Sequence, residues 1–312
     1  MKLRELRHAD GPRLFALLKS EFPEEEAILG MRPEGFEAIL RRLYRADVRL
    51  VLGLLRLARR SPFHLYVLDD GRTIVATTLL SFTARAGFLS TVVVAPEARR
   101  RGYARQLIER ARTETARRGR PYVVLRVLEG NAPARALYAS AGYTELGRER
   151  FAVHERPASL RPAPEERSVR PFRPADAERL AEIANALRPE RWREVLPVRP
   201  QDLHSRTFAD RVFAAQTAAW VVDRGRGPEG FVAASSSPAT DAAHLSTPIL
   251  GPDVEPALAA GLLRTAGAWL AGLSPVRIVT SVGDSDRPAR AALQEVGFHE
   301  GIADLALYRP SG

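Results

Sequence analysis

With 312 residues, 45% of them hydrophobic, and a formal net charge of +10, the chain is long enough for two domains that each bury a core. It has no cysteine, which excludes disulfides, cysteine-ligated zinc and a thiol acyl-enzyme. The six histidines are scattered singly, so we expect no metal site. The charged start MKLRELRHAD lacks the apolar segment of a signal peptide, and no apolar run is long enough to span a membrane. We therefore expect a soluble, cytoplasmic protein with no membrane partner.

The first half reads as a mixture of strands and helices. Asp10 is placed to cap the first helix, and Asp70–Gly71 is typical of a hairpin turn. Two strands that flank one helix are expected to be parallel neighbours in a sheet. In chain order we expect a strand over 2–7, a helix over 10–20, a helical region between about 33 and 60, strands over 64–70, 73–82 and 87–95, a helix over 101–118, a strand over 121–128, a helix over 132–141 and a closing hairpin.

The most informative segment is VVVAPEARRRGYARQLIERA at 92–111, where an apolar strand breaks into a basic turn that opens a helix. The first turn of a helix carries unpaired N–H groups and the positive end of the helix dipole, so it favours an anion. Gly102 lets a phosphate approach the main chain closely, and Ala104 keeps the next position small. The arginines of the turn supply bidentate donors. The alternative is a solvated, arginine-rich helix start.

Together with the following strand and a helix that carries Asn131 and Tyr138, this segment resembles the acetyl-coenzyme A site of the GCN5-related N-acetyltransferases (GNAT). Arg99, Gly102 and Ala104 match the family's Q/R-x-x-G-x-G/A loop. The resemblance implies acetyl-CoA as co-substrate, no metal, and main-chain contacts from the strand to the pantetheine arm, although VVV is also a buried strand. The implied cofactor-binding residues are Val92, Val93, Val94, Arg99, Arg100, Arg101, Gly102, Tyr103, Ala104, Arg105 and Asn131.

The resemblance also implies a catalytic role for Tyr138, as the acid that protonates the departing thiolate. A core aromatic on an amphipathic helix is the alternative for this residue. Asn131 can equally be the N-cap of the helix over 132–141, and both roles can hold together. The sequence does not identify the general base. Glu129 is the nearest candidate, with a solvated loop carboxylate or a water chain to bulk as the alternatives.

An internal repeat divides the chain into a domain over 1–156, a linker over 157–168 and a second domain over 169–312. LRELRHADGPRLFALL is echoed by VRPFRPADAERLAEIA, where Asp176 takes the place of Asp10, and NAPARALYASAGYTE is echoed by DRPARAALQEVGFHE at an offset of 155. We therefore expect an α/β (α+β) fold of two tandem GNAT-like domains, each a twisted mixed sheet flanked by helices.

The second half departs from the motif where the chemistry would sit. Glu255 replaces Arg99, Leu258 replaces Gly102, and Leu293 replaces Tyr138, so this domain is expected to be degenerate and to lack a cofactor site. The glycines of GRGPEG at 225–230 spell a dinucleotide fingerprint but lie between two strand-like runs, where a hairpin turn is expected instead.

The basic excess lies in the first half, which holds 29 Lys+Arg and 18 Asp+Glu against 18 and 19 in the second. A polyanionic cofactor and an arginine-rich coding bias both account for it, and the absence of aromatic interleaving disfavours nucleic acid as a partner. The acidic cluster at 21–26 is either an exposed turn and helix start or a site that attracts a cationic amine.

The function expected is an N-acetyltransferase whose first domain acetylates a small-molecule or peptide amine by direct attack in a ternary complex. The alternative is a non-catalytic acyl-CoA-binding regulatory or interaction protein.

Overall fold

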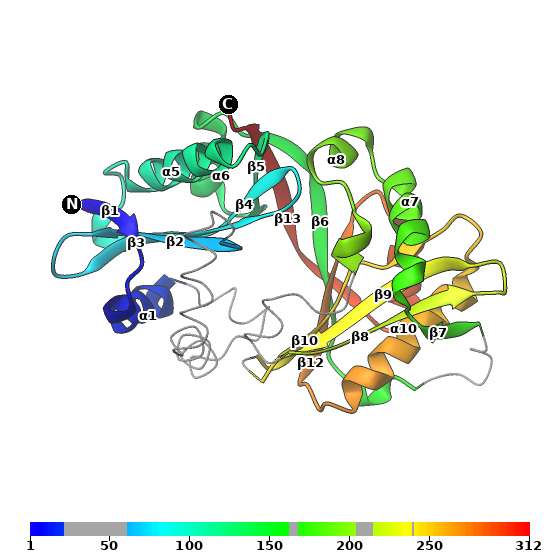
Figure 1. The fold of residues 1–312 in the computed structure, drawn as a ribbon. Helices are drawn as coiled ribbons and strands as arrows, with labels where there is room; N and C mark the ends of the chain where they lie inside the picture. The colour runs from blue at the N-terminus through cyan, green and yellow to red at the C-terminus, as the bar shows by residue number, and fades with distance from the viewer. Residues whose placement is uncertain (22–60, 162–167, 204–214, 239) are drawn as a thin grey trace.

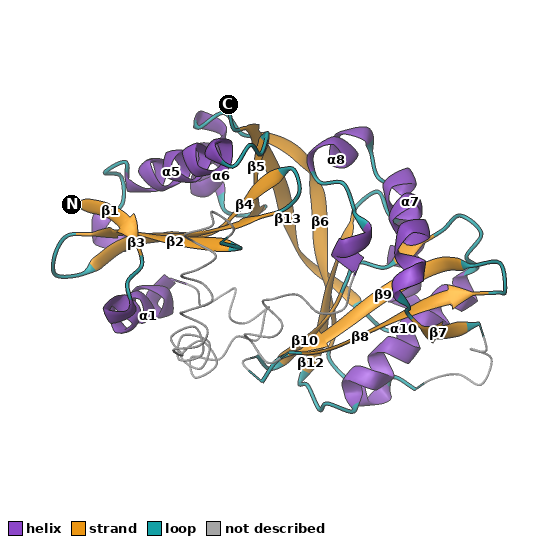
Figure 2. Ribbon diagram, viewed as in Figure 1, coloured by secondary structure: helices purple, strands orange, loops and turns teal. Residues whose placement is uncertain are grey.

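The computed structural model describes residues 1–21, 61–161, 168–203, 215–238 and 240–312. All the strands within these ranges belong to a single 13-stranded mixed sheet that runs through both halves of the chain, with helices on its faces (Figures 1 and 2). Its order is β1-β2-β3-β4-β5-β13-β6-β12-β10-β9-β8-β7, and β11 pairs with β9 off this path. The expected α/β class is confirmed.

The elements of the first half follow the expected order closely. Hydrophobic alternation and the Asp70–Gly71 turn give the antiparallel pair β2–β3, and β4 pairs in parallel with β5 across helix α5, as predicted. The helical region expected between 33 and 60 lies outside the described residues. The elements are β1 (Lys2–Glu5), α1 (Gly11–Glu21), β2 (Phe63–Asp69), β3 (Ile74–Phe82), β4 (Ala86–Val94), α5 (Tyr103–Arg117), β5 (Tyr122–Leu128), α6 (Ala132–Ser140) and β6 (Thr144–His154).

The second half repeats this order. The glycine-rich segment at 225–230 joins the antiparallel strands β8 and β9, so the hairpin interpretation is confirmed and no dinucleotide-binding helix follows it. The elements are β7 (Val169–Pro171), α7 (Ala177–Leu187), α8 (Glu190–Val195), β8 (Gln216–Asp223), β9 (Pro228–Ser236), β10 (Ala242–Leu245), β11 (Ile249–Leu250), α10 (Pro256–Ala271), β12 (Arg277–Gly283), α11 (Arg287–Glu295) and β13 (His299–Pro310).

The last strands of the two halves are exchanged. β13, from the end of the chain, pairs with β5 of the first half, whereas β6, from the first half, pairs with β12 of the second. β6 and β13 also pair with each other, so they form the centre of the sheet (Figure 1). The closing hairpin expected after residue 141 is therefore wrong: the second strand beside β5 comes from 299–310. Strand pairing between distant segments leaves no trace in local periodicity, which explains the error.

The register of the central pair is symmetric about one position. Arg148 lies opposite Leu305, Glu149 opposite Asp304, and Arg150 opposite Ala303. Glu149 and Asp304 are separated by the 155-residue offset of the repeat, so they are equivalent positions that face each other. The two halves are thus related by a pseudo-twofold arrangement that passes between these two carboxylates.

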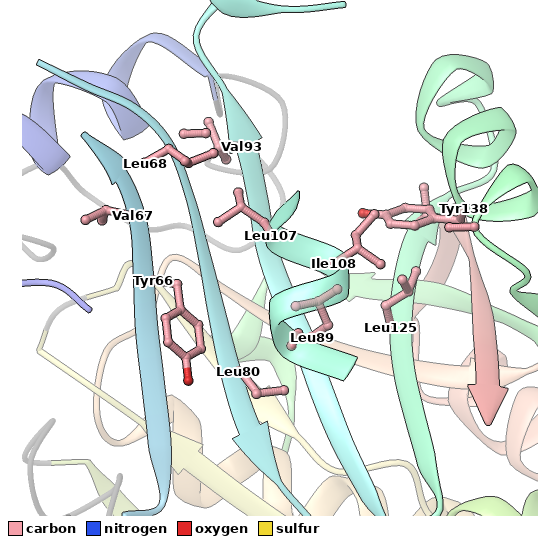
Figure 3. Close-up of a cluster of buried hydrophobic side chains, with 14 of the residues drawn as sticks. Tyr66, Val67, Leu68, Leu80, Leu89, Val93, Leu107, Ile108, Leu125 and Tyr138 are labelled. Atoms are coloured by element: carbon pink, nitrogen blue, oxygen red, sulfur yellow. The ribbon is translucent and has the colours of Figure 1, made fainter. Parts of the chain in front are cut away.

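The exchanged strand β13 also contributes side chains to the hydrophobic core of the first half. Leu305 and Leu307 of β13 pack in the first-half core with Leu107 and Ile108 of α5, and Figure 3 shows this core between β2, β3, β4, β5 and α5. On the other face of the same strands, Val195 of α8 packs with first-half residues and with Ala306. The predicted linker is partly docked, since Leu160 is buried in the second-half core.

Asp10 and Asp176 do not cap helices through their side chains in the way expected. Each accepts hydrogen bonds from an arginine of the neighbouring strand instead: Arg4 Nη1 donates to Asp10 at 2.6 Å and Arg170 Nη1 donates to Asp176 at 2.8 Å. Each arginine also pairs with an aspartate at a hairpin, Asp69 or Asp223, so the same ion cluster is built twice. The arginine lowers the pKa of Asp176, and that of Asp10 in the same way. A guanidinium between two carboxylates satisfies more lone pairs than a helix N-cap would, which explains the difference.

Residues 1–156 produced alone should not form a coenzyme-binding sheet, because β5 then loses its partner β13 and exposes an unpaired edge. Circular dichroism and calorimetric titration with coenzyme A would compare this fragment with the full chain. Addition of the 169–312 fragment is the control, and it should restore structure. Binding by 1–156 alone with the affinity of the full chain would contradict the requirement for the exchanged strand.

Arg170→Met should destabilise the protein by about 3 kcal/mol near pH 6, because it leaves the buried Asp176 without its partner. Lowered carboxyl pKa values contribute stability above the unfolded pKa of about 3.9 that is lost as the pH falls through the folded pKa, so the deficit should shrink at acid pH. Urea unfolding at several pH values measures it. The control Arg179→Met removes an exposed pair with Glu182 and should cost less than about 0.5 kcal/mol. A pH-independent deficit would contradict this role of Arg170.

Candidate active site

The candidate site is a cleft where two parallel strands separate. β4 and β5 pair from Ala86–Tyr122 to Leu89–Leu125 and no further. Within the described residues, no hydrogen bond joins 90–94 to 126–128 across the gap. The main-chain groups on the facing edges are therefore available to a ligand, and the cavity between them has a volume of about 930 Å³.

A β-bulge separates the strands. Between the β3–β4 pairs Thr77–Val93 and Leu79–Ser90, β4 has one residue more than β3. The extra residue is accommodated by Thr91, whose φ of 55° is unusual for a β-branched side chain. Thr78 Oγ1 donates to Ser90 O at 3.0 Å and fixes the bulge. The strain at Thr91 is consistent with a site at which the backbone is shaped for a ligand.

One end of the cleft is the start of α5. The first intrahelical acceptor is Gly102 O, to which Gln106 N donates at 3.1 Å, and the N–H groups that precede Gln106 are the unpaired donors of a helix N-terminus. Arg100 and Gly102 both have left-handed φ, 63° and 78°, and alternation of this kind turns successive N–H groups toward one point. A Cβ at Gly102 would meet nothing within 4 Å, so the space in front of the turn is open. This geometry fits a pyrophosphate.

The arginines of the turn differ in their placement. Arg100 and Arg105 line the cavity, whereas Arg101 is exposed in the same turn and is not part of the cavity wall. Arg99 Nε donates to Val94 O at 3.2 Å, which ties the turn back to β4. Arg105 Nη2 donates to Ser140 Oγ at 2.8 Å, so it links the start of α5 to the end of α6.

The other predicted residues come together on the cavity wall. Asn131 caps α6, with its Oδ1 accepting from Ala134 N at 3.1 Å, so the N-cap interpretation is confirmed. Tyr138 is buried at 6% exposure, packs edge-to-face on Tyr143 and extends from α6 toward the core (Figure 3). Its core-aromatic interpretation is confirmed, and its catalytic role stays a prediction. The predicted residues on the wall are Val92, Val93, Val94, Arg99, Arg100, Gly102, Tyr103, Ala104, Arg105, Asn131 and Tyr138.

Sequence reasoning missed part of the site. Thr91, Arg126 and Leu128 also line the cavity, and no motif marks them. Their only signal is their position at the ends of the two strands that were expected to be parallel. Glu129, the nearest candidate base, pairs with Arg148 and is not on the cavity wall.

The equivalent gap in the second half is bridged. β10 and β12 pair in parallel as far as His244–Val279. Beyond that point Thr247 Oγ1 donates to Ser281 O at 2.8 Å and Thr280 Oγ1 donates to Ser246 O at 3.3 Å. Glu255, whose carboxylate stands where the first half has Arg99, is the N-cap position of α10 and lies 3.6 Å from Arg224. The two threonine hydroxyls thus connect the strands at the position where the first half has a gap.

Comparison with known proteins gives a family match for the first half of the chain. Residues 13–143 match the acetyltransferase (GNAT) family. This match lies within the first half of the chain and covers less than half of the 312 residues. No curated protein matches the chain.

Solved structures extend the likeness to the whole chain. A tandem GNAT protein from the clavulanic acid biosynthesis pathway, solved without acetyl-CoA, is 15% identical with a TM-score of 0.64, over 100% of this chain and 98% of that one. A GCN5-related N-acetyltransferase from Sphaerobacter thermophilus is 16% identical with a TM-score of 0.64, over 99% and 95%. A putative acetyltransferase from Pyrococcus horikoshii is 14% identical with a TM-score of 0.59, over 100% and 89%. At these identities the likeness is one of fold, and the tandem GNAT architecture is the fold of this chain.

No helix within the described ranges is long and apolar enough to cross a membrane.

Gly102→Glu should abolish coenzyme A binding, because it places a carboxylate in the open space before the N-terminus of α5. Wild-type protein should titrate calorimetrically with about one coenzyme A per chain. Gly71→Glu is the matched control: it has a φ of 94° and open surroundings, but it lies in the β2–β3 turn. Both variants carry the same backbone strain, so equal loss of affinity, or unchanged affinity in Gly102→Glu, would mean that the turn does not bind phosphate. A stoichiometry of two would contradict a single site.

Proposed function

We propose that the chain is an acetyl-CoA-dependent N-acetyltransferase whose cleft between β4 and β5 transfers the acetyl group to a primary amine. The observation that carries this proposal is the separation of β4 and β5 directly beside the unpaired N–H groups at the start of α5, within the segment that matches the family. Bound acetyl-CoA would supply the acyl group as a thioester. We propose that 1–156, completed by β13, forms the catalytic unit, and that 169–312 has no cofactor site.

The residues of the cleft divide the work by position. The turn at 100–105 would hold the pyrophosphate. Main-chain groups of Val92, Val93 and Val94, on the edge of β4 that β5 does not pair with, would hold the pantetheine arm in an extended form. This arrangement would aim a main-chain N–H at the thioester oxygen, and a preorganised donor of that kind is a large contribution to acyl transfer. The side chain of Val93 packs in the core, so binding and packing use different atoms of the same strand.

Tyr138 would supply the proton that the departing thiolate needs. Tyr138 belongs to the wall of the cavity and is only 6% exposed. Because its ring is packed in the core, its hydroxyl is held in a fixed place. Direct attack by the amine in a ternary complex fits a chain that has no cysteine to form a thiol acyl-enzyme. The acceptor proposed is a small-molecule or peptide amine.

Tyr138→Phe should lower turnover by about a hundredfold or more while it leaves coenzyme A affinity and thermal stability nearly unchanged, because only the hydroxyl is removed. The loss should shrink with acyl donors whose thiol leaves more easily. Release of the coenzyme thiol, followed with a thiol reagent, measures turnover without background because the protein has no cysteine.

Tyr143→Phe is the matched control. Its ring packs against Tyr138, and its buried hydroxyl has no hydrogen-bond partner among the described residues. Equal turnover losses in the two variants, or full turnover in Tyr138→Phe, would make Tyr138 a packing residue. Tight binding of coenzyme A without thiol release for any amine would instead favour a non-catalytic acyl-CoA-binding protein.

A further inference from the structure

Asp304 is a buried carboxylate with little compensation. Its side chain is 10% exposed, and its only charged neighbour of opposite sign among the described residues is Arg126, with Nε at 3.8 Å from Oδ2. No hydrogen bond to its carboxylate is formed within the described ranges. Buried carboxylates normally accept several hydrogen bonds, so one without any needs an explanation.

The exchanged strand places Asp304 next to the cleft. Asp304 lies opposite Leu128 of β5, and both Leu128 and Arg126 line the cavity. Arg126 follows Leu125, the last residue of β5 that pairs with β4, so it stands where the two strands begin to separate. Asp304 is not itself on the cavity wall, but it is the strand neighbour of Leu128, three residues beyond Leu125 on the side toward which the cleft opens.

Asp304 lies on the face of the sheet opposite α5, the helix that begins at the turn over 100–105. Leu305 and Leu307 pack with α5, whereas Ala306 packs with Val195 on the opposite face, and Asp304 shares the face of Ala306 because side chains alternate along a strand. A ligand whose phosphates lie at the start of α5 would reach the cleft from one side. A second ligand that approaches from the other side would reach the face of the sheet that carries Asp304.

The charges on this face favour a cation. Glu149 of β6 lies directly opposite Asp304, and these two carboxylates share the single guanidinium of Arg126, which pairs closely with Glu149. Like charges that face each other across a strand pair destabilise the sheet unless something neutralises them. Burial raises the pKa of Asp304 above its ordinary value, so this carboxylate binds a proton more readily than an exposed one.

We propose that Asp304, which the C-terminal half contributes through strand β13, binds the ammonium group of the acceptor at the cleft of the N-terminal half and takes its proton. This rests on the proposed acetyltransferase function and names its base and acceptor class, a primary ammonium. The Asp304 carboxylate accepts one proton from R–NH₃⁺, and the resulting R–NH₂ attacks the thioester carbonyl carbon. The C–N bond forms and the C–S bond breaks, and the thiolate takes a proton from Tyr138 or solvent. The acetylated nitrogen loses its second proton to solvent, the Tyr138 hydroxyl is reprotonated from solvent where it acted as the acid, and Asp304 returns its proton to solvent.

The test compares Asp304→Asn with wild type, using tyramine, spermidine and glycylglycine as amine probes. The control is Glu300→Gln, which removes another carboxylate from the same strand but one that pairs with Arg290, outside the cleft. kcat and KM for each amine are measured from thiol release between pH 5 and pH 9, and coenzyme A affinity is measured by calorimetry.

Asp304→Asn should lower kcat/KM for the amine by about a hundredfold or more. It should also remove the acid limb of the pH profile that wild type shows as Asp304 becomes protonated, beside Arg126 and Glu149, the charged groups that face it from β5 and β6. Coenzyme A affinity should stay within about twofold of wild type, and Glu300→Gln should keep both the rate and the limb. A merely structural Asp304 would leave the limb in place. Unchanged kcat/KM, or loss of the limb in both variants, would overturn the assignment.

A separate measurement distinguishes this assignment from the proposed function. The carboxyl ¹³C resonance of Asp304, identified by its absence in Asp304→Asn, is titrated in the coenzyme A complex with and without spermidine. Spermidine should lower the apparent pKa of this carboxyl. If wild type binds coenzyme A but releases no thiol with any amine, the acetyltransferase function fails while the spermidine shift still supports an ammonium site. Absence of the shift together with an unaltered pH profile would refute the role of Asp304.

Discussion

The antiparallel pairing of β6 with β13 is the interaction on which the rest of the structure depends. It makes one sheet out of two halves, because each strand also pairs with a strand of the half to which it does not belong in sequence. Without β13, the main-chain groups of β5 would form an open edge, and the core around Ile108 would lose Leu305 and Leu307. The cleft of the first half is therefore a property of the whole chain, although all of its motif residues lie within 92–138.

Few differences in sequence separate the half with an open cleft from the half whose corresponding strands are bridged. Both halves have a pair of parallel strands that separate before a helix begins. In the first half a bulge at Thr91 opens the gap and a glycine leaves the helix start clear. In the second half two threonine hydroxyls cross the gap, and Glu255 stands at the helix start. The charge follows the same division, since the net excess of basic residues lies entirely in the first half and a polyanion would be attracted there.

Sequence predicted what is local. Strand alternation, the Asp70–Gly71 turn and the Asn131 cap each depend on residues within one element, and each was found within one or two residues of its expected place. The turn at 99–105 before α5 was found for the same reason, and its binding of phosphate stays a prediction. The exchange was not, because β13 and β5 are more than 170 residues apart and either strand satisfies the same alternating pattern. Asp304 could not be placed at the cleft without that pairing, and Glu129 was chosen only because it was near in sequence.

The duplicated ion clusters separate what the fold needs from what the site needs. Arg4 with Asp10 and Asp69, and Arg170 with Asp176 and Asp223, tie the first strand of each half to its first helix and its first hairpin. This constraint belongs to the scaffold, so it is present in both halves. The glycine-containing turn at 99–105 is present in one half only, while the other half supplies β13 and α8 to the sheet that holds the cleft. The two halves are thus alike where the sheet must be held and different where the cleft must be open.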